Sequence, residues 1–353
     1  MALRRRSERT AFVLSGGGNL GALQVGMLQA LAEHAIVPDL VLGCSVGALN
    51  GATYARAPTQ AGVARMAENW MSIDSPTLMP SSRLPSALQL LRKGASLHDN
   101  GGLRESVETM LGDQRRFDEL LLPFECVATT VDTAMAHWFT AGDLVEPIMA
   151  SAALPAVYPP VTIDGVRYVD GGVVDNVPIA RAVELGCTRL FVIQVGPHGR
   201  PDADIRRPLD GALLAYWLAR NSRFARDLAA LPEGVEAIVL PPGERPELKY
   251  HDFSETAALI DQGYSTTWAF LDSRAGEIKA RRSAASWRSR LGRLRLPTGR
   301  GRTDAAEAAA VDPAGAIVLG DEMPEQDSAP GEPGVGEDEH ATGGDDTTRE
   351  DHR

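Results

Sequence analysis

Short apolar runs alternate along the chain with stretches of helical periodicity. The run AFVL at residues 11–14 stops at SGGG, and apolar residues then recur at helical spacing over 20–31, ending near His34. A continuous apolar run of this length is typical of a strand buried on both faces. The pattern therefore predicts a strand followed directly by a helix.

The same alternation continues to about residue 240. The further strands are predicted in PDLVLGC (38–44), PFECVATTV (123–131), RLFVIQV (189–195) and EAIVLPP (236–242), and further helices in VGALNGATYARA (46–57) and PIARAVELG (178–186). Alternating strands and helices predict an α/β fold, a three-layer α/β/α arrangement around a mainly parallel central sheet. Right-handed crossovers then place the loops that follow the strands at one edge of the sheet, where sites are built.

Charge divides the chain into unlike parts. Residues 304–353 carry 15 acidic and 2 basic side chains with no aromatic residue, which predicts a disordered acidic tail. Residues 273–303 hold 10 basic side chains and one acidic one. We expect residues 1–10 to be a basic extension and residues 11–272 to be one folded catalytic domain.

The composition also limits location and partners. The basic start is followed by too few apolar residues for a signal-peptide core or a membrane span, so we expect a cytoplasmic protein. Cys44, Cys126 and Cys187 are widely spaced and are interpreted as small buried residues, not as a disulfide or zinc framework. Residues 1–272 carry 31 acidic and 23 basic side chains, and this net charge of −8 argues against nucleic acid as a partner.

Two glycine-containing motifs follow the first two predicted strands. In GCSVG, residues 43–47, Ser45 lies between a strand and a helix, and Gly43 and Gly47 permit the tight turn of a nucleophile elbow. A capping serine in an ordinary turn is the alternative. In SGGGNLG, residues 15–21, the consecutive glycines leave backbone amides uncovered at a helix start, as an anion site requires.

The anion bound by the second motif has two interpretations. Gly16, Gly18 and Gly21 satisfy the dinucleotide pattern G-x-G-x-x-G, but that reading needs an acidic residue at the end of the second strand. Asp39 precedes that strand, and the end of the strand is occupied by Gly43-Cys44-Ser45. Acyl transfer, with the glycine loop as an oxyanion hole, fits better.

A nucleophilic serine needs a base, and two kinds of candidate are present. His198 and His251 follow later strands and would complete a conventional triad. The alternative is Asp170: Asp164-Gly165 predicts a hairpin whose second strand ends at Asp170, and Gly171 and Gly172 then turn the chain away.

The motifs GGGNLG, GCSVG, ASAALPAVYPP and DGG, in this order, resemble those of the patatin-like phospholipases, which are serine lipid acyl hydrolases. The resemblance covers residue 11 to about residue 272, with DFSETAALIDQGYSTTWAFL as the closing helix. It implies a Ser-Asp dyad of Ser45 as nucleophile and Asp170 as proton acceptor, and no metal or cofactor. It also implies an oxyanion hole formed by the amides of Gly16, Gly17 and Gly18.

One position departs from the family pattern. The residue before the last glycine of the first motif is usually Arg or Lys, and here it is Leu20. The backbone donors are unaffected, but the loss of a fixed charge leaves the choice between phospholipids and neutral esters or thioesters open. An acyltransferase or thioesterase with the same nucleophile, and a catalytically weak lipid-binding regulator, remain alternatives.

Three further segments have two readings each. Leu88, Leu90 and Leu91 fit the core or a lipid channel, and the aromatic residues of YWLARNSRFARDL, residues 216–228, fit either role. In residues 273–303, Trp287, Leu291 and Leu294 share one helical face with arginines around it. That segment fits either a peripheral helix at the inner membrane surface or a solvated linker.

Overall fold

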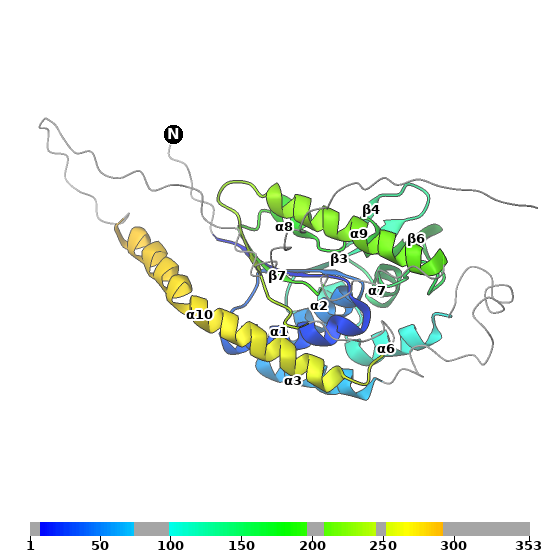
Figure 1. Ribbon diagram of the computed structural model, residues 1–353, viewed down its shortest axis with the longest axis horizontal. Coiled ribbons are helices and arrows are strands. Elements are labelled where there is room, and N and C mark those ends of the chain that lie inside the picture. Colours follow the sequence, from blue (N-terminus) through cyan, green and yellow to red (C-terminus); the bar gives the residue numbers. More distant parts are fainter. Residues whose placement is uncertain (1–7, 74–98, 196–207, 245–251, 292–353) are drawn as a thin grey trace, which may run out of the picture. The chain divides into compact units, whose positions relative to one another are not determined.

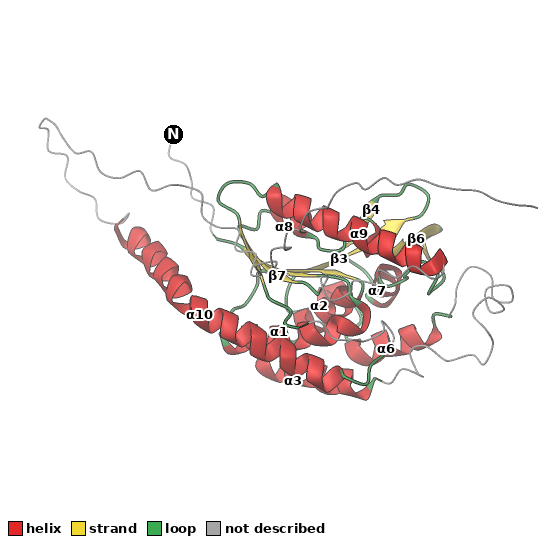
Figure 2. Ribbon diagram, in the orientation of Figure 1, coloured by secondary structure: helices red, strands yellow, loops and turns green. Residues whose placement is uncertain are grey.

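The computed structural model describes residues 8–73, 99–195, 208–244 and 252–291, without the side chains of 208–210, 213 and 275–291. A central sheet separates two helical layers (Figure 1, Figure 2). The strands are β1 (Thr10–Leu14), β2 (Leu40–Cys44), β3 (Phe124–Thr130), β4 (Ala136–Phe139), β5 (Val161–Ile163), β6 (Val166–Asp170), β7 (Arg189–Ile193) and β8 (Glu236–Val239). The helices are α1 (Gly21–Glu33), α2 (Val46–Arg56), α3 (Gln60–Ser72), α6 (Gly101–Leu111), α7 (Val145–Ser151), α8 (Ile179–Glu184), α9 (Pro208–Ala229) and α10 (Thr256–Leu291), with short 3-10 turns η1 (Gly18–Leu20), η2 (Phe117–Glu119) and η3 (Gly171–Val173).

The sheet has the strand order β5-β6-β3-β2-β1-β7-β8, with β4 paired to β3. The pairs β2-β3, β1-β2, β1-β7 and β7-β8 are parallel, whereas the pairs that involve β4, β5 and β6 are antiparallel. The expected α/β fold with a mainly parallel sheet is therefore confirmed. Because β1, β2 and β7 lie in the middle of the sheet and are covered on both faces, they need the continuous apolar runs seen in the sequence.

Side chains alternate between two cores on opposite faces of the sheet. Phe12 and Leu14 of β1 pack with α1, α2, α3, α7 and α10. Ala11 and Val13 of the same strand point to the other face, where α8 and α9 pack. Figure 1 shows α8 and α9 on one side of the strands and α1, α2, α3, α6 and α10 on the other.

The closing helix extends beyond the predicted end near residue 272. α10 continues without a break to Leu291, which is the last residue of the chain that the structure describes. Trp287 and Leu291 are thus helical, whereas Leu294 lies outside the described residues, as do Leu88, Leu90 and Leu91. Among the described helices, none is both long enough and apolar enough to cross a bilayer.

Candidate active site

The ends of the parallel strands β1 and β2 and of the antiparallel strand β6 lie together at one edge of the sheet. β2 pairs with β1 and with β3, and Asp170 at the end of β6 stands opposite Ala128 of β3. The three predicted motifs follow directly: the glycine loop after β1, Ser45 after β2 and the loop 171–176 after β6. Asp39 precedes β2 at the opposite edge, where its carboxylate accepts the Thr10 amide at 2.8 Å, so it is far from the position that a dinucleotide ribose requires.

Ser45 occupies a strained turn between β2 and α2. Its φ and ψ are 54° and −123°, which is an unusual conformation for a residue with a side chain. Such strain, worth about 1–3 kcal/mol, is typical of functional positions, and this strand-turn-helix geometry is that of a nucleophile elbow. The turn predicted from GCSVG is present in the structure.

Gly43 and Gly47 are needed for space. A Cβ at residue 43 would lie 2.3 Å from the carbonyl oxygen of Gly47, and one at residue 47 would lie 2.5 Å from that of Leu14. The turn therefore packs directly on itself and on the end of β1. Backbone strain is carried by Ser45, and the two glycines allow its neighbours to approach.

Asp170 is buried and faces Ser45. The Ser45 side chain lies close enough to the Asp170 carboxylate to lower the pKa of that carboxyl. The Gly172 amide donates to Asp170 Oδ1 at 2.7 Å. Burial outweighs these contacts, so the pKa of Asp170 lies above its ordinary value. The side chains of two residues 125 positions apart thus meet at the edge of the sheet.

The hairpin that positions Asp170 forms as predicted. β5 and β6 pair in antiparallel fashion, and Asp164 and Gly165 between them both have positive φ, 51° and 79°, as a two-residue hairpin turn requires. The Asp170 amide donates to the Ala153 carbonyl at 2.9 Å, and the Thr129 hydroxyl donates to the Asp170 carbonyl at 2.9 Å. The backbone at Asp170 is therefore fixed on both sides.

The glycine loop offers fewer free amides than the sequence suggested. The Gly16 amide donates to the Asn176 carbonyl at 3.2 Å, so it is already engaged with the loop after β6. Gly17 and Gly18 donate no hydrogen bond within the described residues. The three expected oxyanion donors therefore stay a prediction, and the Gly16 amide is the weakest candidate of the three because it already donates to a carbonyl.

Leu20 and Gly21 follow the loop and are buried against the core. Leu20 is 6% exposed, and a Cβ at residue 21 would lie 2.3 Å from Val46 Cγ2. Gly171 is similarly confined, with Val127 O 2.3 Å from its Cβ position. A basic side chain at residue 20 would have to be buried, so the apolar residue suits its surroundings.

The two histidines of the described chain pack against aromatic rings. The His34 ring lies 4.3 Å from that of Trp268, and the His137 ring lies 4.5 Å from that of Phe139. Neither is a hydrogen-bond partner of Ser45 in the described residues. His198 and His251, the triad candidates, lie outside them.

Three contributions to the site were missed in the sequence. Ser151 accepts the Ser45 amide at 2.8 Å, Asn176 contacts the glycine loop, and Tyr216 of α9 lies with its hydroxyl 3.4 Å from Asp170 Oδ1. Ser151 lies in the quoted segment ASAALPAVYPP and Asn176 follows DGG, so nearness to a motif was the available signal. Nothing local distinguishes Tyr216 from a core aromatic residue.

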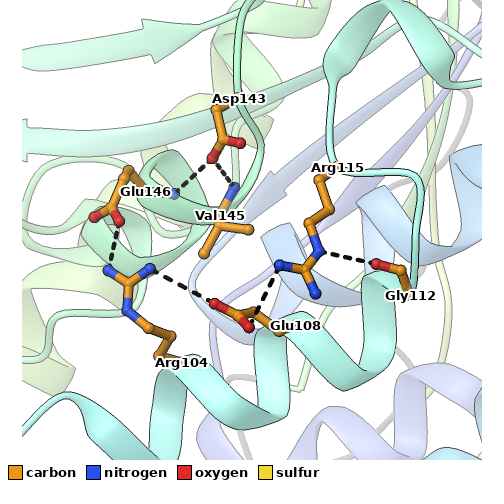
Figure 3. Close-up of polar contacts among 7 residues, drawn as sticks. All are labelled: Arg104, Glu108, Gly112, Arg115, Asp143, Val145 and Glu146. Carbon is orange, nitrogen blue, oxygen red and sulfur yellow. Dashed lines mark hydrogen bonds and ion pairs between the residues drawn. The ribbon is translucent and has the colours of Figure 1, made fainter.

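Polar contacts hold α7, which carries Ser151, against α6. Asp143 Oδ1 accepts the Val145 amide at 2.8 Å at the start of α7, and Glu146 pairs with Arg104 of α6 (Figure 3). Glu108 bridges Arg104 at 3.8 Å and Arg115 at 3.4 Å. These groups lie at the surface, so they supplement the burial of α7 against β3 and β6.

The three cysteines are buried and free, as expected. Cys44 precedes the nucleophile, and its Sγ lies 3.9 Å from Asp170 Oδ1. Burial raises the pKa of the Cys44 thiol well above its ordinary value, and the Asp170 carboxylate raises it further. Cys44 is consequently a neutral neighbour of the Ser45-Asp170 pair.

Known proteins match the same region. A family model for patatin-like phospholipase matches residues 12–183. Patatin-like phospholipase domain-containing protein 7 of Rattus norvegicus is 31% identical over 210 residues, which are 59% of this chain and 15% of that protein. Lysophospholipase NTE1 of Eremothecium gossypii is 28% identical over 220 residues, 61% of this chain and 13% of that protein, so this chain spans only a small part of such relatives.

Among solved structures, VipD from Legionella pneumophila is similar at 14% identity and a TM-score of 0.40, over 76% of this chain and 67% of that one. The family model begins in β1 and ends in α8, and it therefore includes the glycine loop, Ser45 and Asp170. Residues 12–183 of this chain thus form a patatin-like phospholipase domain.

Proposed function

We propose that this chain is a serine lipid acyl hydrolase of the phospholipase A, lysophospholipase or esterase type. In this proposal, Ser45 is the nucleophile and Asp170 is the proton acceptor. One observation carries it: the side chain of Ser45, held in a strained elbow, lies beside the buried carboxylate of Asp170 and lowers the pKa of that carboxyl. A hydroxyl beside a carboxylate needs no histidine to accept its proton.

The first half-reaction forms an acyl-enzyme. As Ser45 Oγ attacks the ester carbonyl carbon, its proton passes to Asp170, and the carbonyl π electrons move onto the oxygen. The C–O bond to the alcohol then breaks, and the alkoxide leaving group takes the proton from Asp170. In the second half-reaction, water attacks the acyl carbon, Asp170 takes the proton of the water, and Ser45 leaves with that proton while the carboxylic acid is released.

The oxyanion is assigned to the glycine loop. The amides of Gly17 and Gly18, which donate to no group in the described residues, are the proposed donors. Each such donor is worth roughly 3 kcal/mol of transition-state stabilisation. Gly16 is assigned a structural part, because its amide joins the loop after β1 to the loop after β6.

The substrate class follows from the family and its named relatives. The two relatives described above are named phospholipase and lysophospholipase, and these names support an acyl ester of a glycerolipid as the substrate. Leu20 supplies no charge for a phosphate, so neutral esters remain within the proposal. A panel of p-nitrophenyl esters, monoacylglycerols, lysophospholipids and phospholipids would rank these substrates.

Labelling with a fluorophosphonate probe tests the nucleophile directly. The full chain should be labelled at Ser45, Ser45→Ala should abolish labelling and hydrolysis, and Asp170→Asn should lower kcat by several orders of magnitude. Cys187→Ala, a buried change near Asp39 at the opposite edge of the sheet, serves as a folding control. Near-normal hydrolysis by Asp170→Asn, with loss on His198→Ala or His251→Ala, would establish the triad alternative instead.

Contact with an anionic membrane is a separate part of the proposal. α10 carries the basic segment as a helix as far as Leu291, and that segment has 10 basic side chains over 273–303. The full chain should therefore co-sediment with vesicles containing anionic lipid and be released by salt. Replacing Arg288 and Arg290 with glutamine should weaken this binding, and unchanged binding would favour the linker reading.

A further inference from the structure

Helix α9 reaches the carboxylate of Asp170 from outside the region matched by the family model. The Tyr216 hydroxyl lies 3.4 Å from Asp170 Oδ1, and the matched region ends at residue 183. Arg220, one turn further along α9, lies with its guanidinium carbon 4.7 Å from the Tyr216 ring centroid. Arg220 thus lies over the face of the Tyr216 ring, and its charge lowers the pKa of the Tyr216 hydroxyl. The three groups form a chain from Arg220 through Tyr216 to Asp170.

The loop after β6 leaves room for this contact. A Cβ at Gly172 would lie 2.6 Å from the Tyr216 hydroxyl and 3.0 Å from Asp170 Oδ1. It would also lie 2.7 Å from Asn176 Oδ1, which accepts a hydrogen bond from Arg220 at 3.4 Å. Gly172 therefore opens the space in which α9 and the Asp170 carboxylate meet, and its own amide donates to the same oxygen.

We propose that Tyr216 and Arg220 are positioning residues for Asp170: Tyr216 donates to Oδ1, and Arg220 orients the Tyr216 hydroxyl and adds a positive charge beside the carboxylate. This inference rests on the proposed function, in which Asp170 must be ionised and directed at Ser45. Because a carboxylate only accepts hydrogen bonds, the Tyr216 hydroxyl is the donor in its contact with Asp170.

The environment of Asp170 explains why its ionised form needs the contacts of Tyr216 and Arg220. Burial raises the pKa of the Asp170 carboxyl, and the contacts that lower it come from Ser45, the Gly172 amide, Arg220 and Tyr216. β2 presents the neutral Cys44 thiol to the carboxylate, the turn after α7 presents the Ala153 carbonyl to the Asp170 amide, and β3 presents the Thr129 hydroxyl to the Asp170 carbonyl. Among the described residues that face Asp170, Arg220 is therefore the cation.

Asp175 does not compete for this role. It lies on the same loop, but its Oδ2 pairs with Arg223 at 3.3 Å, one turn of α9 beyond Arg220. The described contacts of α9 with the loop after β6 are thus divided: Arg223 pairs with Asp175, and Arg220 with Asn176 and Tyr216. The two arginines are distinguishable by mutation.

Tyr216→Phe removes one hydroxyl and keeps the ring. We expect kcat to fall about three- to tenfold with KM unchanged, because a single long hydrogen bond is modest. The acid limb of the pH profile of kcat should move to higher pH by roughly half a unit, since the lost donor favoured the charged form. The matched control is Tyr264→Phe, which removes a tyrosine hydroxyl bound to Glu33 at 2.8 Å, and it should leave both quantities unchanged.

Arg220 is tested with a charge-removing and a charge-retaining variant. Arg220→Met should move the acid limb in the same direction as Tyr216→Phe and further, and Arg220→Lys should restore part of the change. The pH dependence of fluorophosphonate labelling at Ser45 should follow the same order. Acid limbs at the wild-type position in both Tyr216→Phe and Arg220→Met would overturn the proposal. So would a rise in KM for phospholipid alone, since that result would make Arg220 a substrate-binding group.

A measurement that does not need activity separates this inference from the proposed function. The pKa of Asp170 can be followed by carbon NMR of the labelled side-chain carboxyl, assigned through Asp170→Asn. Tyr216→Phe and Arg220→Met should each raise that pKa relative to the wild type. If the probe did not label the wild-type protein, the proposed function would fail, but the titration of Asp170 would still decide the roles of Tyr216 and Arg220. Equal pKa values of Asp170 in all three proteins would refute those roles.

Discussion

The backbone amide of Ser45 donates a hydrogen bond to the side-chain oxygen of Ser151, 2.8 Å away. Ser151 is the last residue of α7 and is fully buried. Two residues later, the Ala153 carbonyl accepts the amide of Asp170 at 2.9 Å. One end of α7 therefore fixes the backbone of both members of the proposed dyad, although neither belongs to that helix.

Ser151→Ala should weaken the site more than it weakens the fold. The change leaves the Ser45 amide without its acceptor, which costs about 1–3 kcal/mol where water does not replace it. We expect a fall in kcat of about tenfold and a small fall in melting temperature. The control is Ser106→Ala in α6, which removes a buried hydroxyl bound to the Gly102 carbonyl at 3.1 Å. Equal losses of activity in both variants would mean that Ser151 acts only through general stability.

The order of elements that positions the site could be predicted because it depends on local signals. The apolar runs of β1 and β2, the glycines around Ser45 and the Asp164-Gly165 turn each specify their own backbone. The parallel pairing of β1 with β2 and the antiparallel pairing of β6 with β3 then bring the ends of those elements together. These local signals made Ser45 and Asp170 candidates, and the resemblance to the patatin-like phospholipases favoured Asp170 over the two histidines.

The remaining parts of the site depend on contacts that no local pattern encodes. Tyr216 lies 46 residues from Asp170, and Ser151 lies 106 residues from Ser45. The engagement of the Gly16 amide follows from the path of the loop around Asn176, which glycine content does not reveal. Propensity identifies a flexible loop, whereas the orientation of each amide is decided by tertiary packing.

Gly43→Ala and Gly47→Ala should both be strongly destabilising. Each added methyl would lie within 2.5 Å of a backbone carbonyl oxygen, and backbone cannot move aside as a flexible side chain can. We expect a loss of about 3 kcal/mol or more of unfolding free energy, measured by urea denaturation. Gly101→Ala is the matched control, since its nearest contact is the Asp99 carboxylate oxygen at 3.2 Å, and it should be nearly neutral. A wild-type midpoint for Gly43→Ala would show that the turn is not as tight as described.

Asp175 should make stability depend on pH near neutrality. Burial raises its pKa to about 7, Arg223 lowers it, and Asp227 and Glu184 raise it. Because the folded pKa lies above the unfolded value, the protonated form stabilises the fold at low pH, and this contribution is lost as pH rises toward 7 and above. Asp175→Asn should therefore gain melting temperature relative to the wild type between pH 5 and pH 8, by roughly 5 °C. A difference between the two proteins that stayed constant over this range would contradict the assignment.

The ion pair between Arg104 and Glu146 links α6 to α7, but it should contribute little to the position of Ser151 (Figure 3). Both side chains are about 40% exposed, and such pairs are worth about 0–1 kcal/mol because water and salt screen them. Arg104→Met should thus lower the unfolding free energy by less than about 1 kcal/mol, with a difference that vanishes near 1 M salt.

Asp143→Ala, which removes the acceptor of the Val145 amide, should lower the unfolding free energy by about 1 kcal/mol, and that loss should persist in salt. Activity should be nearly unchanged in Arg104→Met, because the burial of Val145, Ile148 and Met149 keeps α7 in place; a large loss of kcat there would mean that the surface contacts, and not the core, orient the Ser151 hydroxyl.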